Sequence, residues 1–152
     1  MDEQGKKIVG RIRKQIKKNL ERELANIGED MVANVVEYLD RRNINVTGDL
    51  RKSIVSEVKR EQEKLLLTVG TNLLYAPFVH YGTKPHWPPK KAIRKWVYKK
   101  FGLTHKALNR ATFLIRRKIA EQGTRKKPFL LAVYRLYKPR IVKRLQAAAI
   151  KV

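Results

Sequence analysis

The sequence contains no cysteine, so disulfide bonds, thiolate metal ligands and cysteine nucleophiles are all excluded. It also has no apolar run close to the roughly 20 residues that a membrane-spanning helix needs. The N-terminal stretch MDEQGKKIVGRIRKQ lacks the apolar segment of a secretory signal peptide. We therefore expect a protein that is made in the cytoplasm and stays there unless a larger particle carries it out.

Acidic residues are almost missing from the second half of the chain. Residues 77–152 hold 21 basic residues and one acidic residue, Glu121, whereas residues 1–76 hold 15 basic and 12 acidic residues. The formal net charge of +23 therefore lies almost entirely in one half. Because like charges at this density destabilise a folded chain, the pattern indicates an anionic partner: nucleic acid, an acidic protein surface or an anionic membrane. The alternative is a solvated surface that aids solubility.

Recognisable catalytic groupings are also lacking. The three histidines, His80, His86 and His105, do not combine with other residues at the spacing of a metal site. No acidic residue stands with a histidine in an acid–base arrangement, and the glycines occur singly rather than in a phosphate-binding loop. The sequence therefore predicts a protein that is not an enzyme and that needs no cofactor or metal.

The 152 residues, 43% of them hydrophobic, are enough for one domain with a buried core. We expect an α+β fold with a long N-terminal helix, a small antiparallel β-sheet with a hairpin, and several C-terminal helices packed on it. The single domain, residues 1–152, would consist of a long helical segment (1–42), a strand hairpin with an aromatic and proline-rich strap (43–89) and a basic helical half (90–152).

Residues 3–41 have the apolar spacing of a long helix. Its stripe consists of Ile8, Ile12, Ile16, Leu20, Leu24, Ile27, Met31, Val35 and Leu39. Gly28 is a position at which the helix could bend or be interrupted. The first half of the segment is basic and the second half is acidic, and the helix either packs on a neighbouring subunit or covers a sheet of its own chain.

A capped helical turn is predicted after the long helix, with Thr47 as its N-cap and Leu50 and Ile54 on its buried side. The following elements are strands over residues 55–59 and 65–71, joined by a polar hairpin turn over residues 60–64. Three helices come later. The first covers residues 90–101, the second is capped by Thr104 and runs to about Gln122, and the third starts at Pro128, with stops at Gly102 and Gly123. Pro139 falls inside the last helix and should kink or split it.

The stretch LLYAPFVHYGTKPHWPP, residues 73–89, is aromatic, rich in proline and nearly uncharged. Its first part predicts two helical turns over residues 74–81, which stop at Gly82. An extended strap anchored by Trp87 then leads to the next helix. The stretch is a rigid connection between sheet and helices, a surface that contacts a partner, or both.

The order of short blocks along the chain resembles a family of tailed-phage virion proteins. The blocks are Thr47-Gly48-x-Leu50-Arg51-x-Ser53-Ile54, then Tyr75-Ala76-x-x-Val79-x-Tyr81-Gly82-Thr83 with Pro85, then Ala92 and Trp96, and finally Gly123-Thr124 and Pro128-Phe129-Leu130-x-Ala132. These resemble the neck or tail-completion "tail-component" proteins of HK-type and lambda-like siphophages, to which the lambda minor tail protein gpZ is comparable. The resemblance covers about residues 45–135. In one departure, His80 stands where the family usually has an acidic residue.

The resemblance implies a non-enzymatic α+β subunit that forms a homo-oligomeric ring, a hexamer or a dodecamer, in the head–tail neck of the virion after assembly in the host cytoplasm. It implies a head-closure or connector protein and tail terminator or tail-tube proteins as partners, and no membrane. We add the expectation that basic side chains line the DNA channel or face a partner, and contact DNA without reading its sequence. The candidates are Lys90, Lys91, Arg94, Lys95, Arg110, Arg116, Arg117, Arg125, Lys126 and Lys127. The alternative is a free nucleic-acid-binding protein without sequence specificity.

Overall fold

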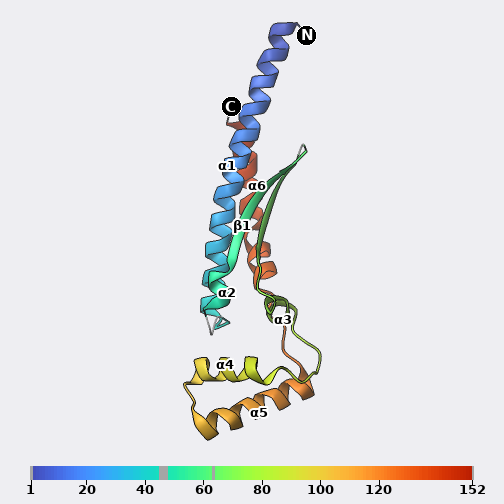
Figure 1. Ribbon diagram of the computed structural model, residues 1–152. Coiled ribbons are helices and arrows are strands. Elements are labelled where there is room, and N and C mark those ends of the chain that lie inside the picture. Colours follow the sequence, from blue (N-terminus) through green and yellow to red (C-terminus); the bar gives the residue numbers. More distant parts are fainter. Residues whose placement is uncertain (1, 45–47, 63, 152) are drawn as a thin grey trace. The chain divides into compact units, whose positions relative to one another are not determined.

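The computed structural model describes residues 2–44, 48–62 and 64–151 (Figure 1). In chain order the elements are α1 (Glu3–Arg41), α2 (Asp49–Lys52), β1 (Ile54–Glu61), β2 (Lys64–Thr71), α3 (Ala76–Tyr81), α4 (Lys90–Phe101), α5 (His105–Gln122) and α6 (Phe129–Ile150). The long N-terminal helix, the two-stranded antiparallel sheet and the C-terminal helices confirm the predicted α+β class.

The chain forms two compact units, each with its own buried residues. The first unit holds the described residues of 1–35, 55–70 and 131–152, and the second holds those of 36–54 and 71–130. Buried apolar side chains of the first unit are Ile27, Met31, Val35, Val133 and Ala148. Those of the second are Leu39, Leu50, Ile54, Ala76, Val97, Leu108 and Phe129. The expectation that residues 1–152 form a single domain stays a prediction.

In the first unit, α1 lies close to the hairpin at Gly28. A Cβ atom at this position would lie 2.8 Å from Ser56 Oγ and 3.0 Å from Leu67 Cδ1. The helix continues through Gly28 without interruption, and the missing side chain makes room for the strands. This part of α1 therefore covers the sheet of its own chain, which is one of the two roles predicted for the helix.

The β-hairpin is longer than predicted. Arg60, Glu61 and Lys64 belong to the strands rather than to a turn, and Gln62 adopts a positive φ of 50° beside them. The strands therefore extend further along the chain than predicted. On β2 the half-buried and exposed residues alternate as predicted, with Leu65, Leu67 and Val69 on the more buried face.

Helix α6 continues through Pro139, so of the predicted kink or split, the split is wrong and the kink stays a prediction. Its C-terminal half is tied to α1 within the first unit, because Arg144 contacts both Glu23 and Asp30 at 2.5 Å. A second contact joins the side-chain amide of Asn19 to the carbonyl oxygen of Lys151. Both contacts are made by residues that follow Pro139, and they hold the C-terminal part of α6 against α1.

In the second unit, α2 is a single turn that begins after Gly48. Gly48 occupies the N-cap position with a φ of 77°, so the predicted N-cap Thr47 is not the cap, and Thr47 itself lies outside the described residues. Leu50 and Ile54 are buried, as predicted. The Ser53 hydroxyl lies 2.6 Å from that of Thr71, which joins the end of α2 to the end of β2.

Helices α4 and α5 form an antiparallel helical hairpin (Figure 1). Gly102 ends α4 with a φ of 62°, and its N–H donates to the Tyr98 carbonyl at 2.9 Å. Val97 and Leu108 are buried in this unit, while most of the basic side chains of both helices are exposed. The apolar sides of the two helices therefore pack together, and the charges are left on the surface.

Candidate functional site

The ends of the α4–α5 hairpin are fixed by an isolated antiparallel β-bridge between Thr83 and Thr124. Gly82 and Gly123, with φ of 73° and 69°, precede the two threonines. A Cβ atom on Gly82 would lie 2.4 Å from the Thr124 carbonyl oxygen, and one on Gly123 would lie 2.0 Å from that of Thr83. The sequence predicted both glycines as helix stops but missed the pairing. Its only signal was the repeated Gly-Thr pair after a helix.

His80 is a buried residue of α3, with 8% of its surface exposed. Its ring packs edge-on against Phe129, at 5.1 Å between centroids, and against Tyr81, at 4.6 Å. Its Nδ1 atom has no hydrogen-bond partner among the described residues. Burial lowers the pKa of His80, so the ring stays neutral at neutral pH. A carboxylate, which is usual at this position in the resembling family, would face the same desolvation here.

The extended segment after Gly82 is fixed by contacts of Trp87 and Pro88 with side chains of α5. Trp87 is 57% exposed, and its ring lies 6.5 Å from that of Phe113 and 5.2 Å from the Arg116 guanidinium. Arg116 also donates through Nε to the Pro88 carbonyl oxygen at 2.9 Å. The predicted anchoring by Trp87 thus takes the form of a surface stack, in which an aromatic ring and a guanidinium face its indole. Arg116, one of the predicted DNA-facing residues, is engaged in holding this strap.

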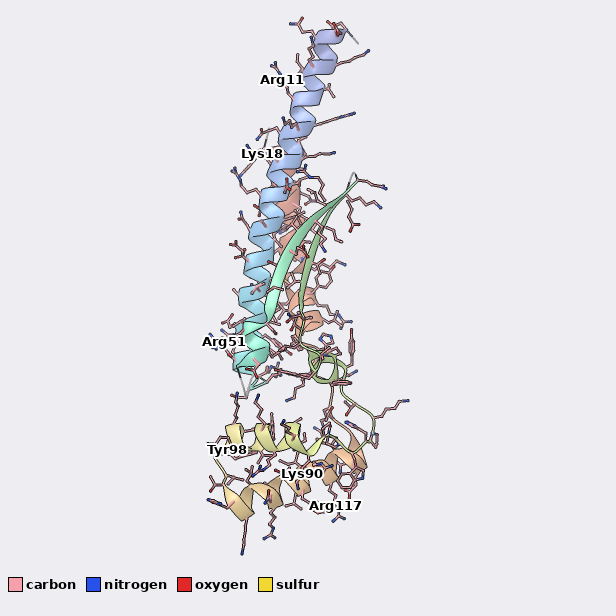
Figure 2. The ribbon with its side chains drawn as sticks, viewed as in Figure 1. Arg11, Lys18, Arg51, Lys90, Tyr98 and Arg117 are labelled. Atoms are coloured by element: carbon pink, nitrogen blue, oxygen red, sulfur yellow. The ribbon has the colours of Figure 1, made fainter. Side chains whose placement is uncertain are left out.

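The other predicted basic residues lie on one part of the second unit. Lys90, Lys91, Arg94 and Lys95 lie on α4, Arg110 and Arg117 on α5, and Arg125, Lys126 and Lys127 on the loop that follows α5. All of these are exposed, and Figure 2 labels Lys90 and Arg117. Among the described residues, only Arg117 of this group forms an ion pair, with Glu121 at 2.8 Å. The arrangement leaves a surface of unneutralised positive charge.

Further exposed side chains that the prediction left out lie on the same two helices. Lys99, Lys100, Lys106 and Lys118 add exposed positive charge. Tyr98, Phe101 and Phe113 add exposed aromatic rings, and the Lys100 ammonium lies 4.8 Å from the centre of the Trp96 ring. Cations interleaved with aromatic rings are typical of surfaces that bind a nucleic-acid backbone without sequence preference.

A second surface of this unit is apolar. Leu74, Phe78 and Tyr81, on and beside α3, are 91%, 60% and 76% exposed. No charged side chain occurs between residues 72 and 81 at neutral pH, since His80 is buried and neutral. Such an exposed apolar surface is typical of a site of protein contact.

The residues of the resemblance motif divide between packing and surface. Leu50, Ala76 and Phe129 are buried; Gly48, Ser53, Val79, Gly82, Thr83, Trp96 and Pro128 are half-buried; and Arg51, Tyr75, Tyr81 and Pro85 are exposed. The buried members belong to the core of the second unit, and one of the exposed members, Tyr81, is part of its apolar surface. Among the described residues, no group of three or more histidine and acidic side chains could hold a metal ion. Nor is any described helix long and apolar enough to cross a bilayer.

Comparison with known proteins gave one match. A family model described as "Bacteriophage HK97-gp10, putative tail-component" matches residues 1–82, which is more than half of the chain. No curated protein matches the chain, and no solved structure does. The matched residues include α1, which the sequence blocks did not cover, and they end at Gly82, so the blocks from Thr83 to Ala132 lie beyond the match.

Proposed function

The chain belongs to the HK97-gp10-like family of phage tail components, and we propose that it forms a ring at the head–tail interface, where it completes the tail and joins it to the head. Membership in this family makes the protein a component of the phage particle. The observation that carries the finer proposal is the unneutralised basic surface of the α4–α5 hairpin, which suits a channel through which DNA passes.

A ring needs two different contact surfaces on each subunit. The first unit offers the N-terminal part of α1, where Ile8 and Ile12 are exposed between basic residues. The second unit offers the apolar surface of Leu74, Phe78 and Tyr81. Because the side chains of that surface are apolar, they can pack against exposed isoleucines of a neighbouring helix. The proposal is a hexamer or a dodecamer held by contacts of this kind.

In the assembled particle, the ring would contact a head-closure or connector protein on one side and tail terminator or tail-tube proteins on the other. Its Lys and Arg side chains would face the channel and meet the phosphates of the passing DNA without reading base sequence. This role needs no catalytic group, and it fits a family of tail components.

Two measurements test the proposal. The purified protein is expected to form rings in negative-stain images and to have a multiple of the subunit mass in solution. Particles made without the protein are expected to give separate heads and tails. A protein that stays monomeric at all concentrations, together with normally joined, infectious particles that lack it, would rule the proposal out.

The net charge of +23 also supports a second candidate, a free nucleic-acid-binding protein. Tight binding of DNA by the isolated monomer at physiological salt, with no copies of the protein in purified particles, would favour this alternative. Presence of the protein in particles at a fixed copy number would instead favour the ring.

A further inference from the structure

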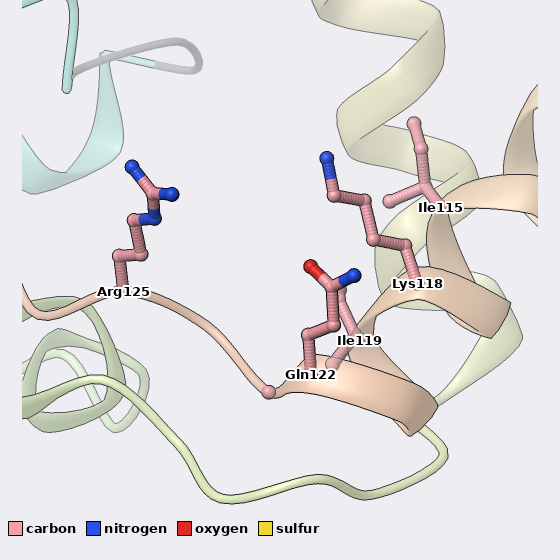
Figure 3. Close-up of a pocket in the computed structure, with 6 residues that line it drawn as sticks. Ile115, Lys118, Ile119, Gln122 and Arg125 are labelled. Atoms are coloured by element: carbon pink, nitrogen blue, oxygen red, sulfur yellow. The ribbon is translucent and has the colours of Figure 1, made fainter.

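A pocket of about 520 Å³ opens at the C-terminal end of α5, within the second unit. The lining residues are Ile115, Lys118, Ile119, Gln122, Gly123 and Arg125. The four from α5 follow the spacing i, i+3, i+4 and i+7 and therefore share one face of the helix. Figure 3 shows the side chains of Lys118 and Arg125 extending in the same direction on either side of the Gln122 amide. The pocket thus combines two cations, one neutral amide and two isoleucine side chains.

The backbone fixes Arg125 opposite α5. The Gly123 N–H donates to the Ile119 carbonyl at 2.8 Å, and Thr124 pairs with Thr83 in the bridge. Beyond Arg125, the Lys127 N–H donates to the Val79 carbonyl at 3.0 Å. Arg125 therefore lies between two held points of the backbone, and its side chain starts from a set position at the pocket wall.

The charges of the pocket are not neutralised. Among the described residues, neither Lys118 nor Arg125 forms an ion pair, and the neighbouring carboxylate of Glu121 is bound by Arg117 at 2.8 Å. Residues 77–130 carry fifteen basic side chains and no other acidic residue. A hollow that gathers two cations in such a field favours an anion.

We infer that this pocket binds a phosphate group of a DNA backbone, with the adjoining sugar against Ile115 and Ile119. The guanidinium of Arg125, the ammonium of Lys118 and the amide of Gln122 are all donors, and phosphate oxygens accept from several donors at once. A polyanion is favoured over a single small anion because exposed cations also extend along α4 and the loop after Arg125. A polymer with a charge at every repeat can meet them all, and DNA is the polyanion that the proposed channel supplies. The inference rests on the proposed function only in taking the DNA to be that of the channel.

The test measures binding of a short, fluorescently labelled DNA duplex of arbitrary sequence to the full-length protein over a range of salt concentrations. Lys118→Gln with Arg125→Gln is compared with Lys52→Gln and Arg135→Gln, which also removes one exposed lysine and one exposed arginine. The pocket variant is expected to lose roughly tenfold in affinity and to lower the salt slope by about 0.9 for the lost phosphate. The control is expected to lose clearly less. Equal losses in the two variants would overturn the inference.

A direct readout is the NMR signal of the Gln122 side-chain amide. It is expected to shift when the duplex is added, and to shift less in the pocket variant's complex. An unmoved Gln122 signal would overturn the inference. Displacement of DNA from the pocket by a poly-glutamate peptide at equal charge would also overturn it, and would favour an acidic protein as the ligand. The outcomes for ring and pocket are separable. If particles need the protein to join head and tail, but the pocket variant binds DNA as tightly as the wild type, only the pocket inference is removed.

Discussion

Thr83 and Thr124 are 41 positions apart, yet each backbone N–H donates to the carbonyl oxygen of the other at 3.1 Å. Their hydroxyl groups also lie 3.1 Å apart. This bridge closes the chain between the end of α3 and the end of α5, so that the α4–α5 hairpin and its basic surface form one loop with fixed ends. The stability of the second unit should therefore depend on the two glycines beside the threonines.

Gly123→Ala is expected to destabilise the protein by about 3 kcal/mol. Gly123 has a φ of 69° and a ψ of −158°, a conformation that is almost restricted to glycine. A Cβ atom at this position would also lie 2.0 Å from the Thr83 carbonyl oxygen. Urea unfolding followed by circular dichroism measures the change. The control is Gly102→Ala, with a φ of 62° but open space around it, for which we expect a loss of about 1 kcal/mol. If both variants lose the same free energy of unfolding, close packing at the Thr83–Thr124 bridge does not contribute to stability.

His80 should make the stability of the protein depend on pH. Burial lowers its pKa below the ordinary value of 6.5, so the unfolded chain binds a proton that the folded chain resists. The stability that the folded chain has with His80 neutral is fully present above about pH 6.5. The free energy of unfolding then falls as the pH drops from there toward the lowered pKa of the folded state. Unfolding free energies measured between pH 7.5 and 4.5 should fall less steeply for His80→Leu than for the wild type.

The control for this prediction is His105→Asn, which removes an exposed histidine with a φ of 45°, a conformation that asparagine tolerates. It is expected to keep the pH dependence of the wild type. A wild-type slope in His80→Leu would assign the effect to another group.

Arg144 joins α6 to two carboxylates of α1 within the first unit. Arg144→Gln is expected to destabilise the protein by about 1 kcal/mol, since the two contacts are charge-assisted but the guanidinium remains partly exposed to solvent. Urea unfolding measures this change as well. Arg41→Gln removes the exposed pair with Glu37 and should cost about 0.3 kcal/mol. A smaller effect at Arg144 than at Arg41 would contradict the assigned role.

The apolar surface of α3 should matter for assembly and not for the stability of the subunit. Leu74→Ser with Phe78→Ser is expected to leave the unfolding free energy within about 0.5 kcal/mol and to lower the mass of the oligomer measured by light scattering. Leu136→Ser, which also removes an exposed apolar side chain, serves as the control and should leave assembly unchanged. Unchanged oligomers in the double variant would remove this surface from the proposed ring contact.

The sequence by itself determined the features that depend on neighbours along the chain. Apolar residues every three or four positions predicted α1 over residues 3–41, and Gly102 and Gly123 marked the ends of α4 and α5. Periodicity and terminal glycines act over one or two turns, so they can be read without knowing where the chain returns. The same locality explains the misses at Thr47 and residues 60–64, where the turn geometry shifted element ends by a few positions.

Only the tertiary structure decided which distant residues meet. The pairing of Thr83 with Thr124, the approach of Gly28 to Ser56 and the hold of Arg144 on Glu23 join positions that no periodic pattern relates. The positive charge of the second half can be counted from the sequence. That Lys118 and Arg125 line the same pocket depends on the Thr83–Thr124 bridge, which fixes the position of the loop after α5. Such contacts depend on the path of the whole chain, because each is made only after the chain between its partners has folded back on itself.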